Sequence, residues 1–188
     1  MRYMPEQWGG FLKETVHSLL SHNTSPIAQS LRGYLYRTNC VIDTGVIISD
    51  PQHFTCGDGC ALRHGTYILN GHGYMSMGNK SHLGAMCYVN VHHGSVHIGS
   101  DVAIGPHTDL IAYSNYYDYG RSVTECRIQE DIEIGSNIFI GAHCSVLPGT
   151  QIADNVIVGA GSVVKGNLEG NTIYAGSPCR KVREGWYE

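Results

Sequence analysis

Charged residues are scarce in this 188-residue chain, and so are the large apolar residues typical of helical bundles. Lys, Arg, Asp and Glu make up 15% of the sequence, whereas an average globular protein has roughly 25%. Only three Phe are present and Leu is uncommon, which argues against a helix bundle. The formal net charge of −4, from 12 basic and 16 acidic residues, provides no basic surface for nucleic acid, so we expect no nucleic-acid partner.

Patterns for targeting, membrane insertion and disulfide bonding are missing as well. No apolar run approaches the roughly 18 residues of a membrane-spanning helix. The first residues lack the charged lead and apolar stretch of a secretory signal. Seven cysteines, an odd number scattered along the chain, do not fit a disulfide framework. We therefore expect a protein of the reducing cytoplasm with no membrane span.

The closest cysteine pair is Cys56 and Cys60, in the stretch C-G-D-G-C. Together with one of the 11 His residues, this pair has the ligand types of a zinc site. The paired C-x-x-C knuckles of structural zinc sites are missing from the sequence, however. We expect free, partly buried cysteines here and no bound metal.

Glycine is abundant, with 24 residues, and much of it lies in a repeat of six. The sequence reads I-G-S-D-V-A and I-G-P-H-T-D from Ile98, and five more sixes follow from Ile134. Position one is Ile or Val, position two is mostly Gly or Ala, and position five is small or β-branched. This period fits a coil of three short strands and three turns, with position one filling the interior and position two at a bend beside the neighbouring coil. The predicted fold class is all-β, a parallel β-helix.

Upstream of Ile98 the repeat is degraded but visible. The register slips by three residues between Val89 and Ile98, so we expect the coil to bulge there. The bulge contains His92 and His93.

Three regions follow from these patterns. Residues 1–38 are expected to form a helical cap over the open end of the coil, because apolar residues recur at helical spacing, first Phe11, Val16, Leu19 and Leu20, then Ile27, Leu31 and Leu35. Residues 39–165 are expected to form the β-helix, with an inserted loop at about 110–131. Residues 166–188 are expected to be a tail with one short strand, at 172–175.

From about Gly78 to Arg183 the chain resembles the hexapeptide-repeat O-acetyltransferases, particularly the galactoside and maltose acetyltransferase branch. The resemblance rests on I-G-S-N-I-F-I-G-A-H-C-S-V-L-P-G, V-G-A-G-S-V-V and A-G-S-P-C-R-K-V-R-E. It implies a left-handed β-helix, a homotrimer with active sites between subunits, and acetyl-CoA as co-substrate without a metal.

By the same resemblance, the pantetheine arm of acetyl-CoA contacts the main chain at Ala142 and Ala160. Small residues there suit a ligand that approaches the backbone closely. Phe139 is expected nearby. Basic residues near the end of the repeat and in the tail are expected to meet the nucleotide phosphates, namely Lys165, Arg180, Lys181 and Arg183.

The family's catalytic His is missing at the matching position, where this sequence has Asn115. Asn cannot serve as a base. His92 and His93 at the register slip are the first candidates to replace it, and His107 and His82, also at turns, come next. Asp109 or Asp118 would orient the imidazole.

The loop after the I-G-P-H-T-D unit is rich in tyrosine, with Tyr113, Tyr116, Tyr117 and Tyr119. Tyrosine rings and hydroxyls suit sugar recognition, so Tyr113, Asn115 and Tyr116 are candidate acceptor-binding residues, although the tyrosines would equally pack against a neighbouring subunit. An uncharged amine acceptor would need no base, so both O- and N-acetylation stay open.

Two other functions remain as alternatives. A zinc site like that of the γ-class carbonic anhydrases would use His107 and His143, which are two coils' worth of sequence apart, but Pro148 stands where that family has a further His. A non-catalytic trimeric scaffold is the other. The prediction is a cytoplasmic, homotrimeric acetyl-CoA-dependent transferase acting on a sugar or nucleotide-sugar, in surface-polysaccharide assembly.

Overall fold

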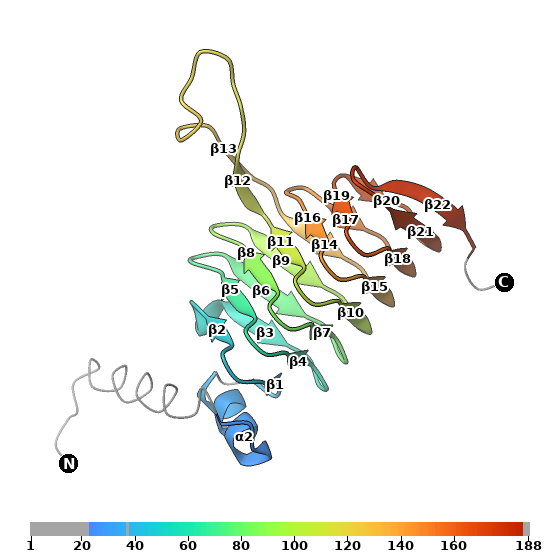
Figure 1. The fold of residues 1–188 in the computed structure, drawn as a ribbon. Coiled ribbons are helices and arrows are strands. Elements are labelled where there is room, and N and C mark those ends of the chain that lie inside the picture. Colours follow the sequence, from blue (N-terminus) through green and yellow to red (C-terminus); the bar gives the residue numbers. More distant parts are fainter. Residues whose placement is uncertain (1–22, 37, 186–188) are drawn as a thin grey trace.

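Short parallel strands dominate the structure, a computed structural model that describes residues 23–36 and 38–185. They form three sheets along one coil, and a hairpin projects from it (Figure 1). Sheet A contains β1 (Val41–Ile42), β4 (Ala61–Leu62), β7 (His82–Leu83), β10 (Val102–Ile104), β15 (Ile138–Ile140), β18 (Val156–Val158), β21 (Thr172–Ala175) and β22 (Arg180–Glu184). Sheet B contains β2 (Ile47–Ile48), β5 (Tyr67–Leu69), β8 (Tyr88–Asn90), β11 (Asp109–Ile111), β16 (Ser145–Val146) and β19 (Val163–Val164). Sheet C contains β3 (Phe54–Cys56), β6 (Tyr74–Met77), β9 (Ser95–Ile98), β14 (Ile132–Ile134), β17 (Gln151–Ile152) and β20 (Asn167–Leu168).

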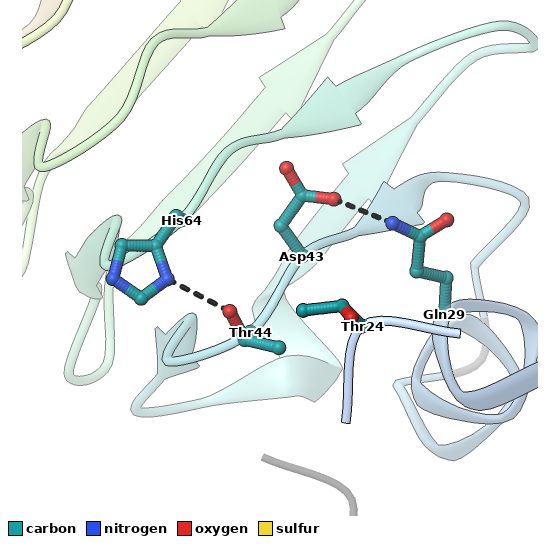
Figure 2. A pocket seen from close by; sticks show the side chains of 5 residues that line it. All are labelled: Thr24, Gln29, Asp43, Thr44 and His64. Atoms are coloured by element: carbon teal, nitrogen blue, oxygen red, sulfur yellow. Dashed lines mark hydrogen bonds between the residues drawn. The ribbon is translucent and has the colours of Figure 1, made fainter. Parts of the chain in front are cut away.

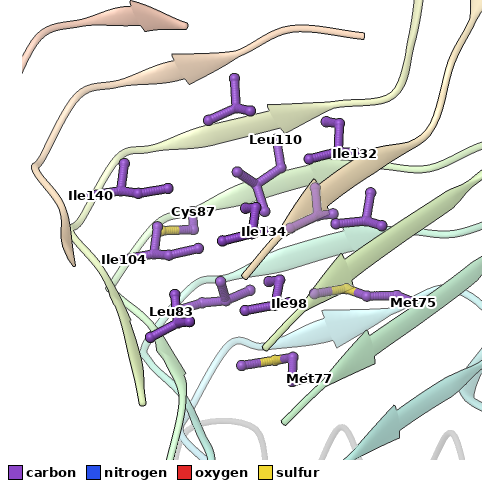
Figure 3. Close-up of a cluster of buried hydrophobic side chains, with 14 of the residues drawn as sticks. Met75, Met77, Leu83, Cys87, Ile98, Ile104, Leu110, Ile132, Ile134 and Ile140 are labelled. Atoms are coloured by element: carbon purple, nitrogen blue, oxygen red, sulfur yellow. The ribbon is translucent and has the colours of Figure 1, made fainter. Parts of the chain in front are cut away.

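The fold is a left-handed parallel β-helix, as predicted, and each coil takes one strand from each sheet in turn. The first-position side chains stack in the interior: Ile98 pairs with Ile134, and Ile134 with Ile152. All three are at most 3% exposed. Figure 3 shows Ile98 and Ile134 pointing into the coil, between the three sheets. Burial of this row removes a continuous column of apolar surface from water.

Glycine at position two is required by the next coil. A Cβ built on Gly105 would lie 2.5 Å from the nitrogen of Ala142, and one on Gly141 would lie 2.5 Å from the nitrogen of Ala160. Real Cβ atoms do not approach backbone so closely, and backbone cannot move aside as a flexible side chain can. The predicted close packing of neighbouring coils at this position is confirmed.

Small polar side chains at position five link the coils through hydrogen bonds. Four of them donate to the carbonyl of the position-two glycine in the following coil: Thr66 to Gly84 (3.1 Å), Cys87 to Gly105 (3.2 Å), Thr108 to Gly141 (2.9 Å) and Cys144 to Gly159 (3.3 Å). A buried carbonyl at a corner of the coil would otherwise lose its hydrogen bond to water, which is costly. This explains why the position accepts Thr, Ser and Cys.

The register slip between Val89 and Ile98 is real. Val89 aligns through Leu110 with Val146, and Ile98 aligns through Ile134 with Ile152. The segment from Val89 to Ile98 is therefore three residues longer than its equivalent. The additional residues widen the corner between β8 and β9.

A helix lies at the N-terminal end of the coil, beside β1 (Figure 1). In α2 (Pro26–Leu35), the Ser25 hydroxyl caps the helix by accepting from the Ala28 nitrogen at 3.2 Å. Arg32 is completely buried, and its Nε donates to the Ile42 carbonyl at 2.7 Å.

The prediction that Ile27 and Leu31 form the buried face of this helix was wrong. Ile27 and Leu31 are 74% and 45% exposed, and Ala28 and Arg32 are buried instead. The small Ala28 lets the helix approach the coil, and the Arg32 guanidinium provides donors for backbone carbonyls at the coil's open end. The other expected apolar residues of the cap, from Phe11 to Leu20, lie outside the described residues.

The coil continues beyond Lys165, where we expected a tail to begin. β20 and β21 add parallel strands to sheets C and A, and β22 then runs antiparallel to β21. Leu168 aligns with Ile152, and Tyr174 with Val158. These larger residues fill interior positions that Ile and Val fill elsewhere, so the pattern of sixes is lost while the coil is kept. The short strand expected at 172–175 is β21.

The inserted loop is a β-hairpin made by β12 (Tyr113–Asn115) and β13 (Arg127–Gln129), which are antiparallel. It leaves the coil between β11 and β14 and projects away from it (Figure 1). A 3₁₀ turn, η1 (Pro51–His53), connects β2 to β3.

Candidate functional site

Four aromatic rings meet at the base of the hairpin. The His92 ring stacks on Tyr113, with centroids 3.9 Å apart and planes 8° from parallel. His93 meets His92 edge-on at 4.2 Å, and His72 stacks on His93 at 5.5 Å. His72 and the His92–His93 pair occupy the same corner, between sheets B and C, on successive coils. The structure thus brings together two predicted catalytic candidates and one predicted acceptor-binding residue.

Gln129 fastens the hairpin to this corner. Its Nε2 donates to the carbonyls of Val91 at 3.2 Å and Ala112 at 3.1 Å, and its Oε1 accepts from the His93 nitrogen at 3.4 Å. Asp131 adds a bond from the Ser95 nitrogen, at 2.7 Å. The position of Tyr113 over His92 is therefore held from β13 as well as from β12.

His92 is half-buried, and its backbone adopts the left-handed conformation, with φ of 57°. Burial lowers its pKa from the ordinary value, and the positive charges of His93, Arg127 and His72 lower it further. Both effects disfavour the imidazolium form. His92 is thus neutral near pH 7 and able to accept a proton.

Asn115 is engaged within the hairpin. Its Nδ2 donates to the carbonyls of Val123 at 2.8 Å and Cys126 at 3.2 Å. This amide closes the loop at the position where the resemblance led us to expect a catalytic His. Tyr116, Tyr117 and Tyr119 project from the hairpin and are 43%, 73% and 90% exposed.

A second corner, between sheets A and B, carries the other candidates. The rings of His107 and His143 stack there at 4.9 Å, with planes 1° from parallel. Ala142 and Ala160 occupy equivalent places beside them on successive coils, since Gly161 donates to the Ala142 carbonyl at 2.8 Å. Asp109 lies near His107, and burial raises the pKa of its carboxyl while His107 opposes the shift.

His107 and His143 lie on consecutive coils, because β10 pairs directly with β15. The prediction that His107 and His143 lie two coils apart was wrong, because the hairpin between them accounts for one coil's length of the sequence. His107 also lies across sheet B from His92, so His92, His93 and His107 do not form one cluster within a chain. His82, which was expected at a turn, lies on strand β7.

The candidate phosphate-binding residues lie toward the C-terminal end of the coil. Lys165 is exposed after β19, and Arg180 and Arg183 are exposed on β22. Phe139 and Arg183 share one outward row of sheet A, through Ile157 and Ile173. Lys181 is paired with Glu169 at 3.3 Å and Glu184 at 2.8 Å.

A cavity of about 450 Å³ lies at the opposite end, between α2 and the first coils. Thr24, Gln29, Asp43, Thr44 and His64 line it, and Figure 2 shows that four of them pair with one another. Gln29 donates to Asp43 at 2.9 Å, and Thr44 bonds to His64 at 2.8 Å. None of the candidate residues lines this cavity.

Metal centres and membrane-spanning helices are both missing from the part of the chain that the structure describes. In residues 23–36 and 38–185, no group of three or more His, Cys, Asp or Glu is arranged to hold a metal ion. Over the same ranges, no helix has the length and apolarity needed to cross a membrane.

The sequence reasoning missed His72 and Gln129. His72 follows Asn70 much as His92 follows Asn90, one coil later, and this similarity is a usable signal. Nothing in the local sequence marks Gln129, because its partners lie across the corner.

Comparisons with known proteins agree with the motifs and the fold. Residues 131–166 match the sequence family described as bacterial transferase hexapeptide (six repeats). The galactoside O-acetyltransferase of Escherichia coli is 34% identical over 116 residues, which cover 59% of this chain and 57% of that protein. A putative acetyltransferase of Saccharomyces cerevisiae is 28% identical over 123 residues, which cover 63% of each chain. The chain thus spans about six-tenths of the length of these relatives.

Solved structures show the same fold. A point mutant of AntD, an N-acyltransferase from Bacillus cereus in complex with dTDP and coenzyme A, superposes with a TM-score of 0.71 at 21% identity, covering 79% of this chain and 81% of that one. A maltose O-acetyltransferase from Clostridium difficile superposes with a TM-score of 0.53 at 20% identity, covering 93% and 84%. The predicted resemblance to the hexapeptide-repeat acetyltransferases is confirmed.

Proposed function

We propose that this protein transfers an acetyl group from acetyl-CoA to a hydroxyl or amine of a sugar or nucleotide-sugar, with His92 as the base. The observation that carries the proposal is the half-buried His92 ring stacked on Tyr113 at the base of the hairpin, where burial lowers the pKa of the imidazole. A base of this kind, beside an aromatic side chain suited to a sugar ring, matches the needs of acetyl transfer.

The reaction needs no covalent acyl-enzyme. The acceptor oxygen or nitrogen attacks the thioester carbonyl, the carbon–sulfur bond breaks, and coenzyme A leaves as a thiol. His92 takes the proton from an attacking hydroxyl and returns it to the leaving sulfur. An amine that arrives uncharged is a better nucleophile and depends less on the base.

Acetyl-CoA would lie along the corner of Ala142 and Ala160. Ala160 is exposed, and a Cβ added at the adjacent Gly161 would meet no atom within 4 Å, so the backbone there is open to a ligand. Phe139 is 49% exposed on the adjoining face of sheet A. Lys165, Arg180 and Arg183 would provide cations for the phosphates.

A homotrimer would unite the two corners. His92 lies at the corner between sheets B and C, and Ala160 lies at the corner between sheets A and B. We propose that the His92 corner of one subunit faces the Ala160 corner of its neighbour. The outward row of sheet C is polar throughout: Thr55, Ser76, His97, Glu133, Gln151 and Asn167. Sheets A and B expose Val41, Ile47, Tyr67 and Phe139, each 38–50% exposed, whereas Tyr74 on β6 is the large residue that sheet C exposes to this degree in the part of the chain described. Exposed apolar residues of this kind suit subunit contacts.

The choice between oxygen and nitrogen acceptors rests on two relatives. The Escherichia coli relative is named for O-acetylation of galactosides, and AntD has been solved with dTDP-4-amino-4,6-dideoxyglucose. We propose a cytoplasmic enzyme of surface-polysaccharide assembly, for which both acceptor types are suitable.

The test is thiol release from acetyl-CoA in the presence of hydroxy- and amino-sugars, free and as nucleotide-sugars. We expect turnover with at least one acceptor class and none with acetyl-CoA alone. His92→Ala should lower turnover with a hydroxyl acceptor, whereas His53→Ala, an exposed His bonded to Asp50, should not. No thiol release with any acceptor, from protein that binds acetyl-CoA, would overturn the proposal.

A further inference from the structure

Three cysteines converge at the open N-terminal end of the coil, far along the chain from the proposed acetyl-transfer site. Cys40 precedes β1, Cys56 ends β3, and Cys60 precedes β4. β1 and β3 are edge strands of sheets A and C, so within residues 23–36 and 38–185 no further coil lies on the outer side of the first one. Cys56 aligns with Met77 and thus takes an interior position, yet at this edge it is half-buried and within reach of solvent.

Thr38 brings two of these cysteines together. Its hydroxyl oxygen accepts from the Cys40 nitrogen at 3.2 Å and lies 2.6 Å from the Cys56 sulfur. With that backbone donor already in place, the hydroxyl proton is available for the sulfur. The thiols of Cys40 and Cys60 lie close enough to Cys56 to influence its pKa.

The three thiols are not equivalent. The Cys60 sulfur donates to the Gly78 carbonyl at 2.8 Å, which is the inter-coil bond that position-five residues make elsewhere. The Cys40 sulfur makes a long contact of 3.6 Å to the carbonyl of its neighbour Val41. Hydrogen bonds from Cys40 and Thr38 lower the pKa of Cys56 to about 6 against the effect of burial, whereas the pKa of Cys40 is raised. Cys56 is the more exposed thiol of the two and lies against the Thr38 hydroxyl, so it is the nucleophile, with the buried Cys40 as the second thiol.

We propose that Cys56 and Cys40 form a peroxide-reactive dithiol, in which Cys56 is the oxidised thiol and Cys40 the resolving one. The Cys56 thiolate attacks a hydroperoxide, the O–O bond breaks, and a sulfenic acid and one water or alcohol form. Cys40 then attacks the Cys56 sulfur, its proton goes to the departing hydroxide, and a disulfide and water form. The two thiols lose two electrons, and the peroxide gains them.

The resulting bond would join the start of β1 to the end of β3 and so close the first coil, whose strands lack partners on one side. This site is independent of acetyl transfer. Neither result below depends on whether the protein is an acetyltransferase.

The first test is oxidation of the whole protein with hydrogen peroxide, followed by alkylation in denaturant and cleavage before aspartate. Cleavage at Asp43, Asp50 and Asp58 separates the three cysteines. We expect loss of two of the seven thiols and a linked pair of peptides containing Cys40 and Cys56. Thiol loss spread over other cysteines, or a bond that excludes Cys56, would overturn the proposal.

The second test compares alkylation rates of native, unmutated protein at pH 7. Cys179 is the matched control, because it is half-buried too and burial raises its pKa. We expect Cys56 to react at least about tenfold faster than Cys179. Equal rates would contradict the role of Cys56.

Variants separate the two roles. Cys40→Ser should let the Cys56 sulfenic acid accumulate, so that dimedone labels it, and Cys60→Ser should still form the disulfide. Thr38→Val should slow alkylation of Cys56 without abolishing the bond. Failure of dimedone to label Cys56 in Cys40→Ser would show that no sulfenic acid forms and would refute the mechanism.

Discussion

Removing the Gln129 side chain should release the hairpin from the histidine corner while leaving the coil folded. Gln129→Ala deletes two hydrogen bonds of 3.1–3.2 Å, to Val91 and Ala112, and one weaker bond from His93. A protein hydrogen bond contributes about 0.5–1.5 kcal/mol net, so the two shorter bonds together contribute about 1–3 kcal/mol to holding the hairpin. Local opening would become about 5- to 150-fold more frequent.

Hydrogen exchange measures that change directly. We expect faster exchange at β12, β13 and the His93 amide, and no change in the strands of sheet A. Turnover should fall, because Tyr113 is no longer held over His92, while the affinity for coenzyme A stays the same. Gln151→Ala is the matched control, since Gln151 is exposed on the polar face of sheet C. Unchanged exchange in the hairpin of Gln129→Ala would refute the idea that this side chain positions the site.

Three further predictions concern the coil, the coenzyme and the loop. Gly141→Ala should destabilise the protein by roughly 1–3 kcal/mol in denaturant unfolding, because its Cβ would lie 2.5 Å from the Ala160 nitrogen; an unchanged midpoint would contradict the packing argument. Ala160→Leu should block coenzyme A binding in calorimetry with a nearly unchanged thermal melt, and normal binding would show that the coenzyme lies elsewhere. Asn115→His should fail to restore turnover to His92→Ala, because it removes the donor to the Val123 and Cys126 carbonyls that closes the hairpin; recovery of turnover would place the base in the loop.

The repeat is visible in the sequence because most first-position residues that fill the interior from Ile98 onward are Ile or Val. The end of the coil could not be recognised from the repeat, because Leu168 and Tyr174 occupy the interior positions that Ile and Val occupy elsewhere. The face of α2 was mispredicted because helical spacing shows where apolar residues lie, and here small size and hydrogen-bonding capacity decided the contact. Ala28 and Arg32 do the packing that Ile27 and Leu31 were expected to do.

Proximity across coils was the least predictable feature of the site. The slip at His92 follows from counting sixes, but its contact with Tyr113 depends on where the hairpin leaves the coil. The inserted hairpin also adds the sequence length of one coil between His107 and His143, so they were predicted two coils apart although they lie on consecutive coils. His72 and Gln129 reach the corner only through the stacking of coils, so a list of local motifs omits them.

The pH dependence of thiol release, compared between the unmutated protein and His92→Ala, tests the central claim most directly. The neutral imidazole is the active form, and burial and like charges lower its pKa. The unmutated protein should therefore lose activity only below the ordinary His pKa of about 6.5. With a hydroxyl acceptor, His92→Ala should lose this acidic limb and turn over roughly a hundred- to ten-thousand-fold more slowly, with unchanged coenzyme A affinity. Equal turnover with the same acidic limb in both proteins would contradict the account.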